Sequence, residues 1–467
     1  MTNFTSLITS KIGESRGVAR LWLEGQKLLR AGVMVGARYE VRACRSTRRL
    51  ELLPCGGKEA ERAFTVSRRE RNGVVVPLLE FRSPVLRELF SAADRVRVVI
   101  RLGRILITEI DKDRKVAERL LRLQQKVRRS EPLAVCSLFH GGGVLDRSVH
   151  SGLLRSGVGS FVQIGVELEG QYLDASLRNN PMLWTDESIA ICSDIRDVKR
   201  GPDIPQCDLL VAGIPCTGAS RSGKAKNKLV ATEDHPSAGA LFMDFLEFVR
   251  FANPAIAIIE NVPDYLNSTS MMVIRSALAS FGYSVFECIL DGAKYGALED
   301  RSRMAVVAYT EGALTNLTEE DVRPLRTKEA TLEAILEPIS PDDARWRSFD
   351  HLHDKETRDL AAGKGFQRQL LPSSAATCGC IGRGYAKGRS TEPFILHPTK
   401  PGLSRLLTAR EHARVKTIPE EVVAGVSETV AHEILGQSVI FTAFEALAAA
   451  VGRLLVRSID VEGQIAA

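Results

Sequence analysis

The sequence predicts an α/β fold, in which a sheet carries helices on both faces and a small β-rich domain precedes it. Three observations support this fold class. Apolar runs of strand length alternate with helical patterns between residues 133 and 310. Several of these runs end in a glycine, an acid or a cysteine, and strand ends are where such sheets place ligand-contacting groups. Residues 20–54 and 76–110 look instead like two copies of one strand-rich unit.

Length and composition bound the class of protein. The chain has 467 residues, enough for two or three domains with full cores. No apolar run approaches the ~20 residues that cross a bilayer, and the N-terminus lacks a secretory pattern. We therefore expect a cytoplasmic protein that contacts no membrane. The nine cysteines are scattered, which in a reducing compartment indicates core thiols rather than a disulfide framework.

Charge is distributed unevenly along the chain. The net charge is +6, yet residues 1–130 carry 29 Lys and Arg against 14 Asp and Glu, so the remainder is acidic. A basic segment on an otherwise acidic chain predicts a polyanionic partner for that segment. An ordinary solvated basic surface is the alternative.

The two N-terminal copies predict a small barrel over residues 1–110. Each copy has a short strand, a helical turn and two alternating strands, at 38–43 with 50–54 and at 95–101 with 104–110. Two such halves can close without free edges. The pattern resembles the AbrB-like swapped-hairpin domains of prokaryotic DNA-binding and toxin-like proteins. Contact with DNA phosphates and plain structural packing are the two interpretations.

If the barrel binds DNA, the turn between the first pair of alternating strands offers the easiest access to a groove. That turn and its edge hold Arg45, Arg48 and Arg49. Residues 111–131 follow as a linker helix, because an apolar stripe recurs at helical spacing at Val116, Leu120, Leu123 and Val127. The stripe covers about three turns, so we expect a helix docked on one domain rather than a dimerising coil.

The candidate nucleophile stands at the end of an apolar run that begins at residue 208. Pro215 closes this run and Cys216 opens a small, polar loop. A thiol held at a strand end near basic residues, which favour its thiolate form, is a candidate nucleophile. The alternative is a buried structural cysteine.

Two further strand ends supply groups that suit the same chemistry. A second apolar strand ends at Glu260, and Arg301 and Arg303 precede a third strand. Thiolate, carboxyl group and guanidinium together suit attack on an electron-poor heterocycle, because the thiolate adds while the acid and the cation hold the ring nitrogen and the carbonyl oxygen.

A glycine-rich turn indicates a ligand pocket. The run 133–139 ends at His140-Gly141-Gly142-Gly143, where glycines let the backbone approach a ligand closely. The next strand ends in Glu167, placed to bind ribose hydroxyls, and a strand at 189–192 leads to Asp194, placed to accept from an adenine amine. A plain tight turn is the alternative for the glycines.

Residues 133–456 resemble the cytosine-5 DNA methyltransferases, whose Pro-Cys, Glu-Asn-Val and Arg-x-Arg motifs stand here in the family's order. The resemblance implies a Rossmann-like, S-adenosylmethionine-dependent methyltransferase sheet with an inserted target-recognition region. It assigns catalysis to Cys216, Glu260, Arg301 and Arg303. The cofactor pocket it implies comprises Phe139, Gly141, Gly142, Gly143, Glu167, Leu168, Asp194, Ile195, Pro215, Leu241, Ser438 and Val439.

The resemblance also divides the chain. It implies a catalytic domain at 132–310, a recognition region at 311–400 without sheet-like runs, and a return to the catalytic domain at 401–467. The expected nucleic-acid contacts are Ser220, Arg221, Lys224, Arg383, Lys387 and Arg389, with Tyr385 as an aromatic among the last three. A zinc site built from His351, His353, Cys378 and Cys380 is disfavoured, because the Cys-x-Cys spacing is atypical.

Several positions depart from the family pattern. Thr217, Ala219 and Gln437 replace a usual glutamine, phenylalanine and asparagine. Val144 replaces a usual glycine, which would tighten the pocket, and Glu299 replaces a common glutamine.

The expected activity is methyl transfer from S-adenosylmethionine to carbon 5 of a flipped-out cytosine in double-stranded DNA, with no metal. A transfer-RNA cytosine-5 methyltransferase and a DNA-binding regulator with an inactive methyltransferase fold are the alternatives. A cognate restriction nuclease fits as a partner, and a monomer is favoured over an oligomer. The recognised bases do not follow from the sequence.

Overall fold

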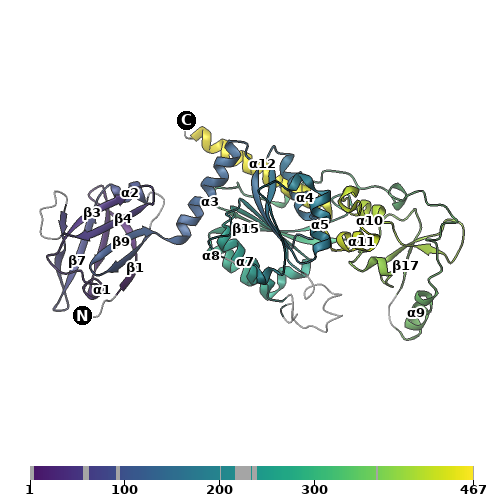
Figure 1. The fold of residues 1–467 in the computed structure, drawn as a ribbon, viewed down its shortest axis with the longest axis horizontal. Coiled ribbons are helices and arrows are strands. Elements are labelled where there is room, and N and C mark those ends of the chain that lie inside the picture. Colours follow the sequence, from purple (N-terminus) through teal and green to yellow (C-terminus); the bar gives the residue numbers. More distant parts are fainter. Residues whose placement is uncertain are drawn as a thin grey trace. The chain divides into compact units, whose positions relative to one another are not determined.

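The computed structural model describes residues 5–55, 63–90, 95–199, 201–215, 233, 239–363 and 367–465. The chain divides into two compact units, Met1–Glu118 and Arg119–Ala467, each with its own core (Figure 1). Cys216, Ser220, Arg221 and Lys224 lie outside the described residues.

The N-terminal unit is a nine-stranded sheet with two short helices. Its strand order is β5-β3-β4-β9-β8-β1-β2-β7-β6, with antiparallel neighbours. The elements are β1 Thr5–Ser15, β2 Val18–Glu24, α1 Gln26–Arg30, β3 Arg38–Cys44, β4 Arg49–Pro54, β5 Ala63–Thr65, β6 Ser67–Arg71, β7 Val74–Arg82, α2 Val85–Leu89, β8 Arg95–Arg101 and β9 Arg104–Glu109.

This sheet confirms the predicted strand pairs and shows that the repeat is longer than predicted. Only Val66 separates β5 and β6, the two end strands of the order, so the sheet curves round to its start. In one repeat, β1 pairs with β8 along its first part and with β2 along its last part. In the other repeat, β5 pairs with β3 and β6 pairs with β7 in the same way. The turns Arg16-Gly17 and Asn72-Gly73 share positive φ angles, which two-residue hairpins favour.

The larger unit is built on a seven-stranded sheet in the order β12-β11-β10-β13-β14-β16-β15. The first five strands of this order are parallel, and β16 runs antiparallel to both of its neighbours. The predicted apolar runs are strands of this sheet, whose members are β10 Leu133–Leu138, β11 Ser160–Glu167, β12 Ile189–Cys192, β13 Leu209–Gly213, β14 Ile256–Asn261, β15 Tyr283–Asp291 and β16 Ser302–Thr310.

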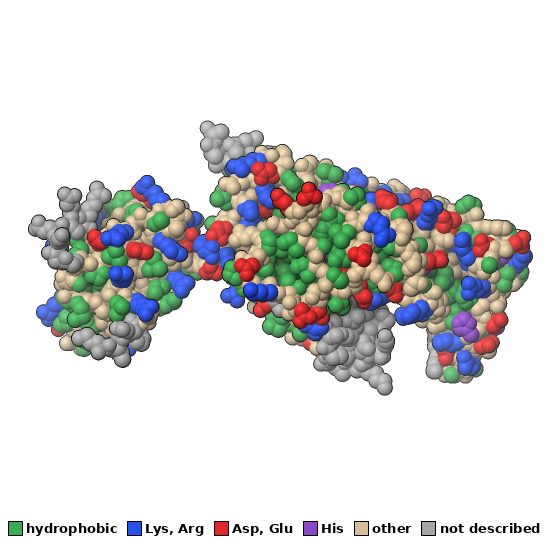
Figure 2. Space-filling view, viewed as in Figure 1, with side chains coloured by type: hydrophobic (Ala, Val, Ile, Leu, Met, Phe, Trp, Pro, Cys, Tyr) green, Lys and Arg blue, Asp and Glu red, His purple; other side chains and the backbone are tan. Residues whose placement is uncertain are grey.

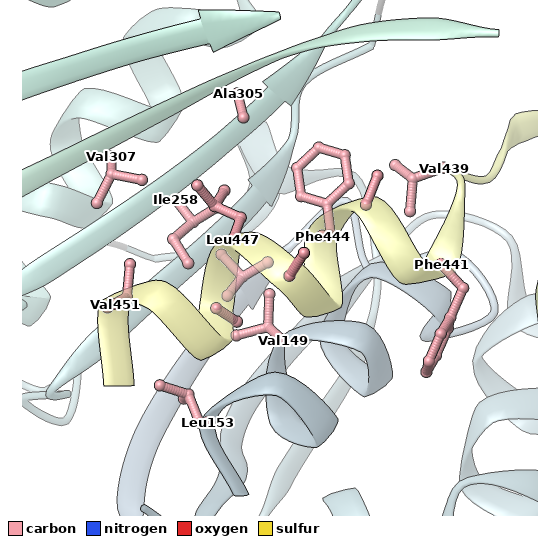
Figure 3. Packing of buried hydrophobic residues seen from close by; sticks show 14 of the residues in the cluster. Val149, Leu153, Ile258, Ala305, Val307, Val439, Phe441, Phe444, Leu447 and Val451 are labelled. Atoms are coloured by element: carbon pink, nitrogen blue, oxygen red, sulfur yellow. The ribbon is translucent and has the colours of Figure 1, made fainter. Parts of the chain in front are cut away.

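Helices cover both faces of this sheet, as predicted. Alternate strand residues point to two separate apolar clusters, so Ile258 faces one and Ile259 the other. The first face packs against α4 Val144–Leu154, α5 Gly170–Asn179 and α12 Phe441–Ile465. In Figure 3, Phe444 and Leu447 of α12 lie between the strands and Val149 of α4. The second face packs against α7 Leu241–Ala252 and α8 Thr269–Ser280 (Figure 1).

Helix α3, Asp111–Arg128, docks on the larger unit through its second half. Leu123 is fully buried in the first apolar cluster. Arg119 is also buried, stacks 3.6 Å from the centre of the Tyr283 ring and donates to Thr310. Arg122 and Lys126 both pair with the buried carboxylate of Asp208, at 2.9 and 2.7 Å. The docking that the apolar stripe predicts is therefore confirmed.

Residues 311–400 contain more regular structure than predicted. Two strands of this region, β17 Gln369–Leu371 and β18 Pro393–Leu396, form a three-stranded sheet with β19 Ser404–Arg405, which lies just after it. Its strands have at most four residues, too few for an alternating pattern to stand out in the sequence. The remaining helices are α9 Asp350–Ala361, α10 Ala409–Val415 and α11 Glu428–Gln437.

No single described helix is long and apolar enough to cross a membrane. The bent pair of α11 and residues 441–459 reaches that length and composition together. Its apolar side chains lie in the first apolar cluster, as Figure 3 shows for Phe444 and Val451, so we assign the pair to the core of the larger unit. Within the described ranges no three His, Cys, Asp or Glu side chains gather as metal ligands.

Candidate active site

Several of the described residues predicted for the site lie at strand ends around the point where the strand order reverses. The chain leaves β10 toward β11 on one side, and β13 and β14 lie on the other side of β10. In parallel sheets the crevice for ligands lies at the carboxyl ends of the strands at such a switch point. The glycine turn follows β10, and Pro215 follows β13, so both predicted segments border this crevice.

Glu260 and Arg303 form an ion pair at the crevice. Glu260 lies near the end of β14 and Arg303 near the start of the antiparallel β16, and the arginine Nε lies 2.8 Å from a carboxylate oxygen. Their side chains are 12% and 13% exposed. Gly213 at the end of β13 pairs with Glu260 in the sheet, and a Cβ on this glycine would lie 3.5 Å from the carboxylate.

Burial raises the pKa of Glu260, and the charges of Arg303, Arg301 and Lys416 oppose this rise without cancelling it. The carboxyl group therefore keeps its proton to a higher pH than an ordinary glutamate. A group of this kind can donate a hydrogen bond to a bound heterocycle.

The segment that leads to Cys216 is fixed from β14. The buried side chain of Asn261 donates to the carbonyl of Ile214 at 3.0 Å and accepts from the amide of Val262 at 2.8 Å. These bonds hold the end of β13 beside Glu260. Cys216 itself lies one residue past the described Pro215, so its contacts are outside the described residues.

The three glycines of the turn differ in their surroundings. A Cβ on Gly142 would meet Ile434 at 2.5 Å, and one on Gly143 would meet Ser176 at 2.4 Å. Gly141, with φ of 59°, would meet nothing within 4 Å. Packing therefore requires glycine at 142 and 143, whereas Gly141 faces open space that a ligand can enter.

A buried polar network supports this turn, and it was not predicted. His140 contacts Ser137 and Asp146 through Nδ1, at 2.8 and 3.0 Å, and Ser176 through Nε2, at 2.7 Å. Asn180 donates to the carbonyl of Gly142. The spacing of Ser137, His140 and Asp146 in the sequence did not predict this network, because Ser176 comes from α5 and Asn180 directly follows that helix.

Glu167 links the turn to the next strand end. One carboxylate oxygen accepts from the amide of Gly141 at 2.6 Å, and the other accepts from the amide of Glu169 at 2.9 Å. The side chain is almost wholly buried at the end of β11. A carboxylate fixed by two backbone amides has lone pairs left for a hydroxyl donor.

Asp194 follows β12 and is held by its neighbour. Its carboxylate accepts from the Arg196 side chain and backbone amide, and these bonds lower the pKa of Asp194 to about 2. Ile195 beside it is buried, whereas Leu168, after Glu167, is 63% exposed. An exposed leucine between two strand ends offers an apolar surface for a flat ring.

Most of the other predicted pocket residues are more enclosed. Phe139 is half-buried against the second cluster, where Leu241 also packs, and Val439 lies in the first cluster. Ser438 directly follows α11, and its hydroxyl donates to the carbonyl of Ile434 in the last turn of that helix. The expectation that Val144 tightens the pocket is wrong, because its side chain is 3% exposed within the first cluster.

Arg301 joins segments rather than lining open space. It is 4% exposed and its guanidinium contacts Glu299, the sulfur of Cys380 and the carbonyl of Gly436. Lys416, fully buried, lies 2.7 Å from Oε2 of Glu299. The oxygen that Arg301 contacts, Oε1, also accepts from the amide of Ile381. We call Glu299, Arg301 and Lys416 the buried charge cluster.

Burial and paired charges act in opposite directions within this cluster. Burial lowers the pKa of Lys416 to about 8, aided by Arg301 and opposed by Glu299. Burial would raise the pKa of Glu299, but the two cations outweigh it, so that pKa is lowered. No local pattern pointed to Lys416, because it lies 117 positions from Glu299 in the chain.

The basic tract at 383–389 faces several ways. Arg383 pairs with Glu169 at 3.1 Å and stacks over Tyr172 of α5, which docks the tract on the catalytic domain. Lys387 and Arg389 are exposed. The Arg389 guanidinium lies against the backbone of Gly384, where a Cβ would clash with it. The expectation for Tyr385 is wrong: the ring is fully buried, and its hydroxyl binds the backbone of Pro393 and Leu407.

The comparisons with known proteins identify the family of the chain. Residues 178–453, more than half of the chain, match the C-5 cytosine-specific DNA methylase family, and the chain belongs to that family. The matched span contains Cys216, Glu260 and Arg303, whereas the glycine turn lies before it.

Curated relatives are similar over part of their length. The type II methyltransferase M.SsoII of Shigella sonnei is 26% identical over 53% of this chain and 64% of its own. M1.ScrFI of Lactococcus lactis subsp. cremoris is 26% identical over 53% and 62%. The chain thus spans a little less than two thirds of these relatives. The S. pombe Dnmt2 methyltransferase structure shares the fold, with a TM-score of 0.54 and 19% identity over 68% of this chain and 98% of its own.

The buried charge cluster generates a stability prediction. Lys416→Met should lower the free energy of unfolding by about 3–5 kcal/mol, because the buried Glu299 carboxylate would lose its nearer cation and keep only Arg301, at 3.3 Å. Adding Glu299→Gln should recover most of the loss, since a neutral amide can still accept from Ile381. Urea unfolding followed by tryptophan fluorescence measures both. Arg410→Met, an exposed cation of α10, serves as control. Equal losses in the single and double variants would contradict the role of the pair.

Proposed function

We propose that the protein is a DNA cytosine-5 methyltransferase that transfers a methyl group from S-adenosylmethionine to carbon 5 of cytosine. One observation carries the proposal: Glu260, with a raised pKa, is held by Arg303 beside the end of the strand that leads to Cys216. The family membership supports the same reaction. The cytoplasmic location expected from the sequence goes with an enzyme that acts on cellular DNA.

Cys216 is assigned as the nucleophile. Its thiolate adds to carbon 6 of the extruded cytosine, forming a carbon–sulfur bond and pushing electron density to carbon 5, which becomes nucleophilic. After carbon 5 has gained its substituent, loss of the carbon-5 proton to a base and expulsion of the thiolate restore the ring. Extrusion of the base from the duplex costs a few kcal/mol.

Glu260 and Arg303 are assigned to the ring that Cys216 attacks. A protonated Glu260 donates to the ring nitrogen and stabilises the negative charge that develops after addition. Arg303, fixed by its contact with the Glu260 carboxyl group, can hold the carbonyl oxygen of the base. Arg301 is assigned as a positioning residue, since its contacts join Glu299 to Cys380 and α11.

The residues around the glycine turn fit S-adenosylmethionine. The open space at Gly141 admits a ligand against the backbone, and Glu167 beside it retains acceptor capacity for ribose hydroxyls. Leu168, Asp194 and Ile195 would hold the adenine, and Phe139 the methionine end. When bound, the cofactor supplies an electrophilic methyl group.

Double-stranded DNA is the proposed substrate, with residues 311–400 proposed to select the bases. Lys387 and Arg389 are exposed and remain candidates for phosphate contact, as do Ser220, Arg221 and Lys224 outside the described residues. Arg383 is engaged by Glu169, so we assign it first to docking this tract on α5.

Cys216→Ser should abolish turnover, because a neutral hydroxyl is a far poorer nucleophile than a thiolate. Labelled cofactor and unmethylated DNA, followed by sequencing of the modified cytosines, measure the activity. Unaltered cofactor affinity in this variant is the control. DNA with 5-fluorocytosine should trap the native enzyme covalently, since fluorine does not leave as the proton does. Near-normal turnover by the variant would remove Cys216 from the mechanism. If labelled cofactor modified transfer RNA and not DNA, the substrate would be transfer RNA instead.

Glu260→Ala should lower the single-turnover rate about 10²–10⁴-fold, the usual contribution of a positioned acid. Because the pKa of Glu260 is raised, the protonated form persists above the ordinary carboxyl range and the rate it supports falls as pH rises through that value. Glu260→Gln keeps a neutral donor and should lose this pH dependence. Glu287→Gln, at an ion pair on β15, is the control. The same pH profile in Glu260→Gln and native enzyme would argue against the proton on Glu260.

Glu167→Ala and Asp194→Ala should each weaken cofactor binding by roughly 1–3 kcal/mol, the scale of hydrogen bonds to charged groups. Titration calorimetry with S-adenosylmethionine measures this independently of turnover. Binding to DNA without cofactor should stay unchanged. Glu187→Ala removes an exposed acid of the same unit and should have no effect. Unchanged affinity in both test variants would place the pocket elsewhere.

A further inference from the structure

One outer face of the N-terminal barrel gathers cations. Along β8, Val96, Val98 and Ile100 are buried, so the alternate side chains point outward. These outward positions include three exposed arginines, Arg95, Arg97 and Arg101.

The neighbouring strands extend the same face, as the pairing of the ladders shows. Lys11 of β1 lies opposite Arg95, and Arg104 of β9 lies opposite Arg101. Thr108 of β9 lies opposite both Arg97 and Arg49 of β4. We call the exposed cations of these four adjacent strands the β8 face: Lys11, Arg49, Arg95, Arg97, Arg101 and Arg104.

These cations lack acidic partners among the described residues. No member of the β8 face has an ion pair there, whereas other arginines of the unit do. The described acid that points outward among them is Glu51, opposite Leu106 of β9. Six neighbouring charges of one sign repel one another, and a polyanion relieves that repulsion.

On the other side of the barrel three arginines are ion-paired, so a lack of acidic partners is not a general property of the unit. Across β2, β7 and β6, Arg20 and Arg82 both pair with Glu80, at 3.4 and 2.7 Å, and Arg69 pairs with Glu24 at 2.9 Å. Figure 2 shows Lys and Arg side chains on one face of the unit, with Asp and Glu among them. These arginines of β2, β6 and β7 are neutralised by acids of the same unit, whereas the cations of the β8 face, without acidic partners among the described residues, are free to bind an external anion.

The expected contacts at the turn before β4 need revision. Arg48 lies 2.6 Å from the buried carboxylate of Glu109, and Arg45 lies 2.7 Å from Glu88. Of the three arginines singled out in the sequence, only Arg49 belongs to the β8 face.

The size of the face suits a nucleic-acid backbone. From Arg95 to Arg101 the strand extends about 20 Å, and from β1 to β4 the three strand spacings sum to about 14 Å. Duplex DNA advances about 3.4 Å per phosphate on each strand, so the long side of the face spans roughly six base pairs. The cations sit on paired strands, which keeps their spacing fixed.

We propose that the β8 face binds the phosphate backbone of duplex DNA. The choice of DNA as the polyanion rests on the proposed function. Contacts to phosphates carry no sequence information, so the face raises affinity for all duplexes and does not choose the methylated site.

The test compares two charge-matched variants of the full-length chain. The first replaces Arg95, Arg97, Arg101 and Arg104 by glutamine. The second replaces Arg42, Arg45, Arg68 and Arg82, which are all ion-paired on the surface of the same unit. Both lose four positive charges. Thermal unfolding of each variant checks that the barrel remains folded.

Binding to a fluorescent duplex is measured between about 50 and 200 mM salt. Each phosphate contact contributes about 0.9 to the slope of log affinity against log salt, so the first variant should lose about 3–4 from this slope and the second less than 1. Equal slopes in the two variants would overturn the proposal, because net charge alone would then explain the loss. Equal competition by polyglutamate and by unlabelled duplex would also overturn it, in favour of an acidic protein partner.

The outcomes separate this inference from the proposed function. A native protein that binds duplex DNA with the predicted slope difference but transfers no methyl group would remove the methyltransferase assignment and keep the β8 face. If the native protein methylates DNA but the first variant binds duplex DNA with unchanged salt dependence, the methyltransferase assignment stands and the β8 face is overturned.

Discussion

The pairing of Glu299 with Lys416 inside the larger unit joins three parts of the chain that the sheet alone does not connect. Glu299 stands just before β16, Lys416 ends α10, and the same carboxylate binds the backbone at Ile381. A buried charge is costly unless it is paired and hydrogen-bonded, so each of these segments constrains the others. The segment at Ile381 is thereby fastened to the residues just before β16. The pKa of Glu260 responds to the charges of Arg301 and Lys416 in the same cluster.

The crevice itself depends on the reversal of strand order between β10 and β13. The reversal leaves the glycine turn on one side and the segment before Cys216 on the other. Each side has its own buried support, His140 with Ser176 beneath the turn and Asn261 beneath Ile214. A proposed cofactor and a proposed nucleophile can therefore approach one another from two rigid elements. Such rigidity favours reaction, since misplacement of reacting groups is costly.

The two units treat charge in contrasting ways. In the larger unit, two cations to which we assign roles are paired with acids, Arg303 with Glu260 and Arg383 with Glu169. In the barrel, the arginines of β8 have no such partners among the described residues, although those of β2 and β7 do. Matched pairs fix geometry, whereas unmatched exposed cations attract a mobile polyanion. The unpaired positive charge of the described part of the N-terminal unit is thus concentrated on one face and does not follow from composition alone.

The sequence by itself determined the class of sheet and the strand ends at which its functional groups stand. Strand ends could be predicted because apolar runs are local signals, and Gly141, Glu167 and Glu260 follow such runs directly. It also showed the duplicated barrel, but not β1, whose sequence alternates weakly.

Only the tertiary structure decided which neighbours each side chain meets. It separated Gly141, which faces open space, from Gly142 and Gly143, which pack against α11 and α5. It buried Tyr385 and brought Lys416 to Glu299. Contacts of this kind join residues far apart in the chain, and no periodicity encodes them, because the packing of several elements around a shared core sets them.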